Sequence, residues 1–262
     1  MSGHLGHRET LGIMIQTTDA VILRSTLFRE TSQLLTFLTP DFGKIFVLAK
    51  GVRRHPRRFS STFNLFTCNR IVFYERSRSN LQLLTQCDLL DPFPAIRKDL
   101  KKTAYAAYFS ELVDRSTEPG HQPTPLYTLL LEALRQLAKR ELLEETARIF
   151  EVKLLLLSGL MPELSQCQAC RGPVTKRVAL SLERGGFLCE RCFQKGKGMF
   201  ELSKGTLVSI RHIATSPWSL AYRMRMLKDS REELKESLKR FIDFYLDEKI
   251  YSRVFLKELE AF

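Results

Sequence analysis

Four of the six cysteines in this chain stand in two pairs whose spacing is typical of metal sites. Cys167 and Cys170 form one Cys-x-x-Cys pair, Cys189 and Cys192 form a second, and 18 residues separate the pairs. Each pair can present two thiolates from one tight turn, and zinc binds four of them in a tetrahedron about 2.3 Å from each sulfur. The spacing predicts one structural zinc ion in a reducing compartment; unpaired thiols or an iron–sulfur cluster are the alternatives.

A catalytic role is not expected for such a site. Four thiolates close the coordination sphere and leave no position for water. The sequence also has no His-Glu-x-x-His run, no Gly-x-x-x-x-Gly-Lys-Ser/Thr phosphate loop and no Gly-x-Ser-x-Gly nucleophile elbow. It therefore favours a protein that is not an enzyme.

A cluster of positive charge lies between residues 42 and 74, which include seven basic residues and no acidic one. Five of the seven fall within residues 50–58, where Gly51 and Pro56 predict an exposed loop. Cations in such a loop can follow a phosphate backbone and release its counterions. The neighbouring Phe59 and Phe63 could stack on bases, although a core position is the commoner use of phenylalanine. We expect DNA contacts from Lys44, Lys50, Arg53, Arg54, Arg57 and Arg58.

The elements that must carry this loop are strands. Residues 14–93 contain five short runs rich in β-branched and large apolar residues, at 20–23, 34–38, 45–48, 69–74 and 81–84. Five strands in so short a segment favour a small closed barrel, such as the OB-fold that often binds oligonucleotides. An SH3-like barrel or another small β domain is the alternative. Cys68 and Cys87 fall in this region and are expected to be buried thiols.

After residue 94 the apolar pattern changes to a helical period. It predicts helices over 100–113, 126–139, 144–160, 204–215 and 232–246, and a short hairpin over 178–182 and 186–188. The expected fold class is therefore α+β with several domains. These are a disordered leader at 1–13, an OB-fold DNA-binding domain at 14–93, and a helical domain in two parts, 94–163 and 201–262, with a four-cysteine zinc module inserted at 164–200.

The charge of the whole chain supports an acidic partner. The 262 residues include 41 Lys and Arg against 29 Asp and Glu, a formal net charge of +12, which favours nucleic acid as a partner. No apolar run approaches the ~20 residues that span a bilayer, and the N-terminus lacks the apolar core of a signal peptide. We expect a cytoplasmic protein without a membrane partner.

Several segments, in the same order along the chain, resemble the RecO family of bacterial recombination mediators. They include residues 20–24 (Ala-Val-Ile-Leu-Arg), 30–36 (Glu-Thr-Ser-Gln-Leu-Leu-Thr) and 42–44 (Phe-Gly-Lys). The more specific ones are 49–54 (Ala-Lys-Gly-Val-Arg-Arg) and an Arg-x-Phe-Glu motif from Arg148 that leads through Pro162 into Cys167. The resemblance covers nearly the whole chain from Met14.

This resemblance implies an N-terminal OB-fold, a helical C-terminal domain and a zinc module. It also implies a nucleoid-associated protein that binds single- and double-stranded DNA, anneals complementary strands and, with RecR, helps to load RecA onto DNA coated by single-strand-binding protein. The acidic tail of that last protein would dock in the helical domain, with Arg148 as the candidate cation; pairing of Arg148 with Glu144 or Glu151 is the alternative. The alternative function is a zinc-ribbon transcription or RNA-binding regulator, whose cysteine module itself reads nucleic acid.

Overall fold

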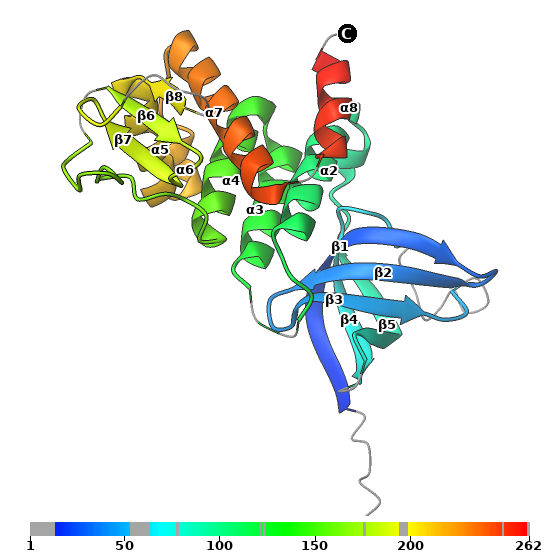
Figure 1. Cartoon of the computed structure of the whole chain (residues 1–262). Coiled ribbons are helices and arrows are strands. Elements are labelled where there is room, and N and C mark those ends of the chain that lie inside the picture. Colours follow the sequence, from blue (N-terminus) through cyan, green and yellow to red (C-terminus); the bar gives the residue numbers. More distant parts are fainter. Residues whose placement is uncertain are drawn as a thin grey trace, which may run out of the picture. The chain divides into compact units, whose positions relative to one another are not determined.

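The chain folds into two compact units in the computed structural model (Figure 1). One comprises Met1–Pro92 with Thr117–Tyr127, and the other comprises Phe93–Ser116 with Thr128–Phe262. The structure describes residues 14–52, 63–76, 79–120, 122, 124–174, 177–193, 199–247 and 249–260. In these ranges, no helix has both the length and the apolar character that a membrane span requires.

The first unit is built on five strands that close into a barrel. β1 pairs antiparallel with both β2 and β4, and a β-bulge between Ile22 and Arg24 marks where its register with β2 shifts. A parallel pairing of β3 with β5 closes the barrel in the order β1-β2-β3-β5-β4. This arrangement confirms the OB-fold prediction over an SH3-like barrel. The strands are β1 (Met14–Phe28), β2 (Ser32–Thr39), β3 (Gly43–Ala49), β4 (Cys68–Glu75) and β5 (Leu81–Asp91).

Alternate strand residues point inward and form the core of the barrel. Phe37 and Phe73 are fully buried there, and Phe63 joins them at 5% exposure. A core position for Phe63, rather than a base-stacking one, is thus confirmed; Phe59 lies outside the described residues. Cys68 and Cys87 are buried free thiols, as predicted.

The segment Thr117–Tyr127 packs on the barrel where β3 begins. Lys44 of β3 forms an isolated parallel bridge with Pro119. Gly43 has φ of +60°, and a Cβ atom there would lie 2.4 Å from the carbonyl oxygen of Gln122, so only glycine fits this turn. The close approach of two backbones therefore fixes the start of β3.

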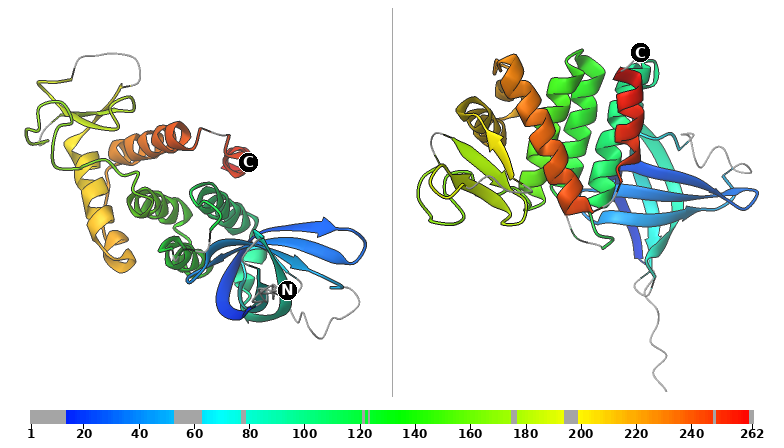
Figure 2. Two further views of the ribbon diagram at one scale, coloured as in Figure 1. Left: turned by 60° about the horizontal axis from the view of Figure 1, so that its bottom comes forward. Right: turned by 45° about the horizontal axis from the view of Figure 1, so that its top comes forward.

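Helices dominate the second unit, and all five predicted helices are present. Figure 2 shows that α2 packs against α4, that α4 packs against α7, and that α8 packs against α2. Phe109 of α2 stacks on Phe150 of α4 with ring centroids 4.2 Å apart, in the core between these helices. The helices are α1 (Pro94–Arg97), α2 (Leu100–Arg115), α3 (Leu126–Lys139), α4 (Leu143–Leu157), α5 (Lys204–Thr215), α6 (Trp218–Ala221), α7 (Lys228–Leu246) and α8 (Tyr251–Glu260).

Some boundaries differ from those predicted. α4 ends at Leu157, three residues early, because Gly159 adopts a left-handed conformation with φ of 69° and the chain turns there. α7 begins at Lys228, four residues early. The sequence pattern did not indicate the short helices α1 and α6 or the C-terminal α8.

The cysteine segment forms a small sheet between α4 and α5. Its strands are β6 (Val178–Ser181), β7 (Gly186–Cys189) and β8 (Met199–Leu202), in the order β7-β6-β8. β6 and β7 form the predicted hairpin, whereas β8 was not predicted. The hairpin ends at Cys189 and so brings the second cysteine pair beside the first.

Candidate metal centre and nucleic-acid interface

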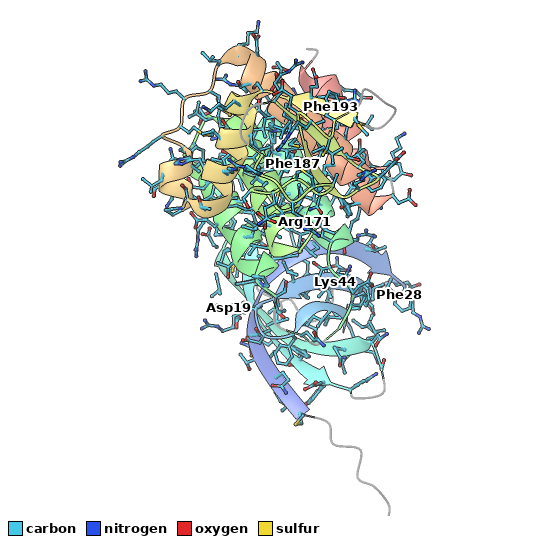
Figure 3. The ribbon with its side chains drawn as sticks, turned by 60° about the vertical axis from the view of Figure 1, so that its left-hand side comes forward. Asp19, Phe28, Lys44, Arg171, Phe187 and Phe193 are labelled. Carbon is cyan, nitrogen blue, oxygen red and sulfur yellow. The ribbon has the colours of Figure 1, made fainter. Side chains whose placement is uncertain are left out.

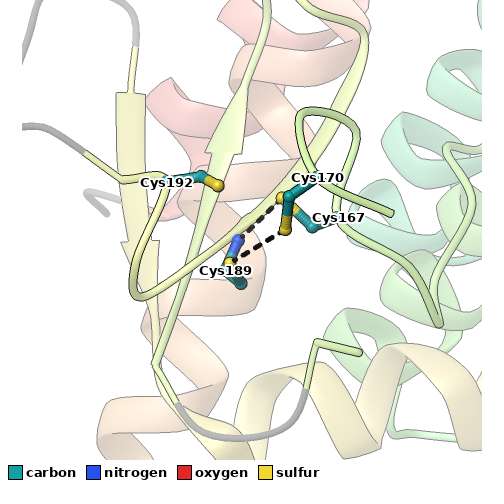
Figure 4. A group of neighbouring side chains, drawn as sticks. All are labelled: Cys167, Cys170, Cys189 and Cys192. Atoms are coloured by element: carbon teal, nitrogen blue, oxygen red, sulfur yellow. Dashed lines mark hydrogen bonds between the residues drawn. The ribbon is translucent and has the colours of Figure 1, made fainter. Parts of the chain in front are cut away.

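The four cysteines of the two pairs meet in one cluster. Cys167 and Cys170 lie in the loop after α4, Cys189 ends β7, and Cys192 follows in the next turn (Figure 4). Their sulfur atoms all lie within 4.8 Å of one another, and those of Cys170 and Cys189 are 3.7 Å apart. A tetrahedron of sulfurs ~2.3 Å from a central zinc ion has edges of about 3.8 Å, so the cluster has the dimensions to hold a metal ion.

Both pairs use the same kind of turn. The backbone N–H of Arg171 donates to the carbonyl oxygen of Cys167 at 2.9 Å, and that of Phe193 donates to the carbonyl oxygen of Cys189 at 3.0 Å. Arg171 has a φ of 58°, which lets the first turn close. Each turn therefore places its two thiols on the same side of the loop.

Backbone N–H groups favour the thiolate form at two of the four cysteines, Cys167 and Cys189, whereas hydrogen bonds with the neighbouring thiols of Cys170 and Cys189 raise the pKa of Cys192 to about 12. Burial by itself raises the pKa of the Cys167 thiol, but N–H donors led by that of Cys189, 3.3 Å from its sulfur, lower that pKa to about 6. The pKa of Cys189 is likewise lowered by the N–H groups of Cys192 and Arg191, which outweigh the opposing effect of burial. These two sulfurs are therefore prepared to bind a cation.

Close contacts hold the two turns together. Gly186 of β7 lies against Gln168, whose side-chain carbon would be 2.3 Å from any Cβ placed there. The Gln168 backbone N–H donates to the carbonyl oxygen of Phe187 at 2.9 Å. Figure 3 shows Phe187 and Arg171 in this module. Gly186 thus permits the hairpin to approach the first turn.

Sequence reasoning missed Arg211 of α5, which anchors the module to the helices. Its guanidinium donates to the carbonyl oxygen of Leu164 from Nε at 2.9 Å and to that of Val174 from Nη2 at 3.0 Å. Those two carbonyls lie on either side of the first cysteine pair. No spacing rule connects an arginine in a helix to carbonyls so far away in the sequence, so the sequence offered no signal for it.

The basic residues expected to bind DNA are only partly described. Lys44 of β3, labelled in Figure 3, is 8% exposed, whereas Lys50, directly after β3, is exposed. The two residues are six positions apart along extended chain, which separates their Cα atoms by about 20 Å. The remaining four, Arg53, Arg54, Arg57 and Arg58, lie outside the described residues.

Arg148 forms an ion pair with a buried carboxylate, that of Glu151. Its Nη2 donates to Glu151 Oε1 at 2.9 Å, and Tyr108 Oη donates to the same oxygen at 2.7 Å. Glu151 is 1% exposed, and burial, then the Glu151 charge, raises the pKa of Tyr108 far above its usual range. The structure therefore pairs Arg148 with Glu151, one of the two partners considered for it.

This ion pair lies at a pocket that carries five cations. The pocket is lined by Tyr105, Tyr108, Arg148, Glu151, Lys235, Lys239, Arg253, Leu256 and Lys257. Tyr105, Tyr108 and Leu256 give it an apolar part. The pocket therefore suits a ligand that combines negative charge with an apolar group.

Comparisons with known proteins agree over both units. The family described as "Recombination protein O N terminal" matches residues 14–93, and the one described as "Recombination protein O C terminal" matches residues 97–253. The DNA repair protein RecO of Shouchella clausii is 30% identical over 247 residues, which cover 94% of this chain and 96% of the relative. The DNA repair protein RecO of Moorella thermoacetica is 32% identical over 243 residues, covering 92% and 90%.

Proposed function

This chain belongs to the RecO family, and from that premise we propose that it binds DNA through phosphates, anneals complementary strands and delivers them to recombination. Family membership gives the chain a role in DNA repair and recombination. The proposal extends to a partnership with RecR in loading RecA onto DNA coated by single-strand-binding protein.

The observation that carries the DNA-binding part is the arrangement of the barrel. β3 of an OB-fold ends at Ala49, and the exposed Lys50 begins a basic segment with four arginines and no acidic residue. OB-folds bind single strands along a groove that tracks the backbone with positive charge. The basic segment is therefore attached to a fold that binds single strands through positively charged side chains.

The proposed metal is one structural zinc ion, held by Cys167, Cys170, Cys189 and Cys192. Zinc supplies no chemistry to a reaction here, because four thiolate ligands fill its coordination sphere. Its contribution is to folding, since a segment of about 37 residues is too short to build much of a core without a metal. The dimensions of the sulfur cluster and the lowered pKa of Cys167 support this assignment.

The pocket beside Arg148 is the proposed dock for the tail of single-strand-binding protein. That tail is acidic and ends in an apolar residue, and the pocket joins cations to apolar surface. Arg148 would serve both Glu151 and the tail, because a guanidinium has five N–H donors.

Binding measurements at several salt concentrations test the proposal. A mediator should bind DNA of unrelated sequences with nearly equal affinity, since phosphates carry no direct base information. The logarithm of its affinity should fall steeply with the logarithm of salt concentration. A preference of ~10³-fold or more for one sequence would instead identify a regulator that reads bases.

A further inference from the structure

The segment from α6 to the start of α7 carries an aromatic and basic patch that the proposed function leaves unused. It comprises residues 217–228 and includes Trp218, the only tryptophan of the chain. It also holds three basic residues, Arg223, Arg225 and Lys228, and no acidic residue. All three basic residues are exposed, and Leu227 beside them is 80% exposed.

Trp218 rests on a fixed aromatic support. Its ring lies 6.1 Å from that of Tyr222, centroid to centroid, with 33° between the planes. Arg140, at the end of α3, places its guanidinium carbon 4.1 Å from the centroid of the Tyr222 ring. The Tyr222 hydroxyl is hydrogen-bonded to Thr146 Oγ1 at 2.7 Å. The indole is therefore held at the surface, half-buried, by a side chain that is itself anchored.

Tyr222 stays neutral in this setting. Burial raises the pKa of Tyr222 to about 12, with smaller opposing effects from Thr146 and Arg140. The acidic groups that also act on it, Glu132 and Glu145, face basic partners of their own. Glu132 lies 3.9 Å from Arg135, and Glu145 lies 3.8 Å from Arg231.

The basic side chains of the patch are available to a ligand. Among the residues that the structure describes, neither Arg223 nor Arg225 has an ion pair. Trp218 and Arg225 are seven positions apart in the sequence, so their Cα atoms are at most about 25 Å apart. An indole and two guanidinium groups are thus within reach of one short stretch of polymer.

We propose that residues 217–228 form a second binding site for single-stranded nucleic acid, in which Trp218 stacks on a base while Arg223 and Arg225 contact phosphates. Base stacking on an aromatic ring combined with a basic path is the general way in which proteins hold single strands. The inference rests on the proposed function in one respect: annealing brings two strands to one protein, and this site would hold the strand that the barrel does not.

The patch suits a single strand better than it suits a duplex or an acidic peptide. A duplex keeps its base faces stacked inside the helix and offers nothing to Trp218 except at its ends. An acidic peptide would use the cations but would not need an indole at the surface. Both therefore serve as comparison ligands.

The single tryptophan makes the test direct. Oligothymidylate should quench the fluorescence of Trp218 in the full chain as it binds, because the indole stacks on a base. A duplex of equal length and a poly-glutamate peptide should leave the emission nearly unchanged. Binding is followed in parallel by the anisotropy of a labelled oligonucleotide, which reports any bound strand wherever it lies.

Substitutions then separate this site from the barrel. In a background where Arg53, Arg54, Arg57 and Arg58 are all alanine, Trp218→Ala should weaken the remaining binding about ten-fold. Arg223→Ala with Arg225→Ala should reduce the salt slope by about 0.7 for each phosphate that is no longer neutralised. The matched control is Lys98→Ala with Lys204→Ala, which removes the same charge from exposed positions elsewhere in this unit.

The outcomes are distinct. Binding by anisotropy without quenching, or quenching by the acidic peptide instead, would overturn the second site and leave the proposed function intact. If the Lys98 and Lys204 control reduced the salt slope as much as the Arg223 and Arg225 variant does, the second site would also be overturned, since only net charge would then matter. If wild type showed no binding by anisotropy at all, the proposed function itself would fail.

Discussion

Arg211 donates from Nε to the carbonyl oxygen of Leu164 at 2.9 Å, three residues before the first cysteine of the four-cysteine cluster. This bond joins α5, a helix of the second unit, to the loop that supplies Cys167 and Cys170. The cysteine module is thus attached to the helices by a charged side chain as well as by the chain itself. Its geometry depends on a residue that no ligand rule would single out.

Replacing Arg211 by alanine should therefore loosen the metal centre. Two carbonyl oxygens lose their donor, and the loop before Cys167 loses its anchor. We expect the zinc affinity to fall by roughly ten-fold, as for other residues that support a metal site. Competition with a chromophoric chelator measures this, with Lys204→Ala on the same helix as the control. Equal zinc affinities in the two variants would show that the anchor does not matter.

The cluster itself should hold one zinc ion per chain. Removing the ion by chelation, or replacing Cys167 by serine, should lower the stability of the second unit by about 2 kcal/mol or more, which corresponds to roughly 4–8 °C in Tm. Cys87→Ala is the matched control, because that thiol is buried in the barrel. Elemental analysis of the folded protein that finds well under one zinc per chain would contradict the assignment.

Arg148 offers a test of the pocket. Alanine there should abolish binding of the acidic tail peptide and also cost about 3 kcal/mol of stability, since it leaves Glu151 buried without its cation. Glu151→Gln keeps the arginine and removes the buried charge, so this variant should still bind the peptide. An Arg148→Ala protein that folds and binds the peptide as wild type does would reduce Arg148 to a structural role.

The attachment of α8 should depend on acid pH. Although burial raises the pKa of Glu111, hydrogen bonds from Ser252 and Tyr251 lower it below its ordinary value of 4.5. A carboxylate with a lowered pKa contributes stability above about pH 4.5 and loses that contribution as the pH falls through its folded-state value. The protection factors of the amides in the first turn of α8, corrected for the pH dependence of intrinsic exchange, should therefore fall below pH 4.5 in wild type. Glu111→Gln should show low protection already at neutral pH and little further change, and a wild-type pH profile of protection in that variant would contradict this account.

The sequence predicted those elements in which local pattern and tertiary packing agree. The helix Lys204–Thr215 was predicted to the residue, because Ser203 caps it and its apolar positions face the core. The cysteine cluster was predicted from spacing alone, since a metal site needs a fixed number of ligands from tight turns. The barrel followed from five short strands, although only the parallel pairing of β3 with β5 established its topology.

The elements and contacts that the sequence did not predict depend on interactions between residues far apart in the sequence. The sequence did not predict α8, whose first turn is held by Glu111 of α2 through hydrogen bonds from Ser252, a contact that no local pattern indicates. β8 is four residues long and exists through its pairing with β6. The support of Trp218 by Tyr222 and Arg140 joins α6 to α3, which no local pattern could reveal.

Annealing of complementary strands coated with single-strand-binding protein tests the central claim most directly. Wild type should accelerate duplex formation well above the rate without protein. A variant with alanine at Arg53, Arg54, Arg57 and Arg58 should lose most of that acceleration. It should remain folded, because exposed cations contribute little to stability. Measured by fluorescence energy transfer between labelled strands, acceleration by wild type and its loss in the variant would support DNA handling through the basic segment after β3. No acceleration by wild type would contradict the account, and full acceleration by the variant would place the DNA path elsewhere on the protein.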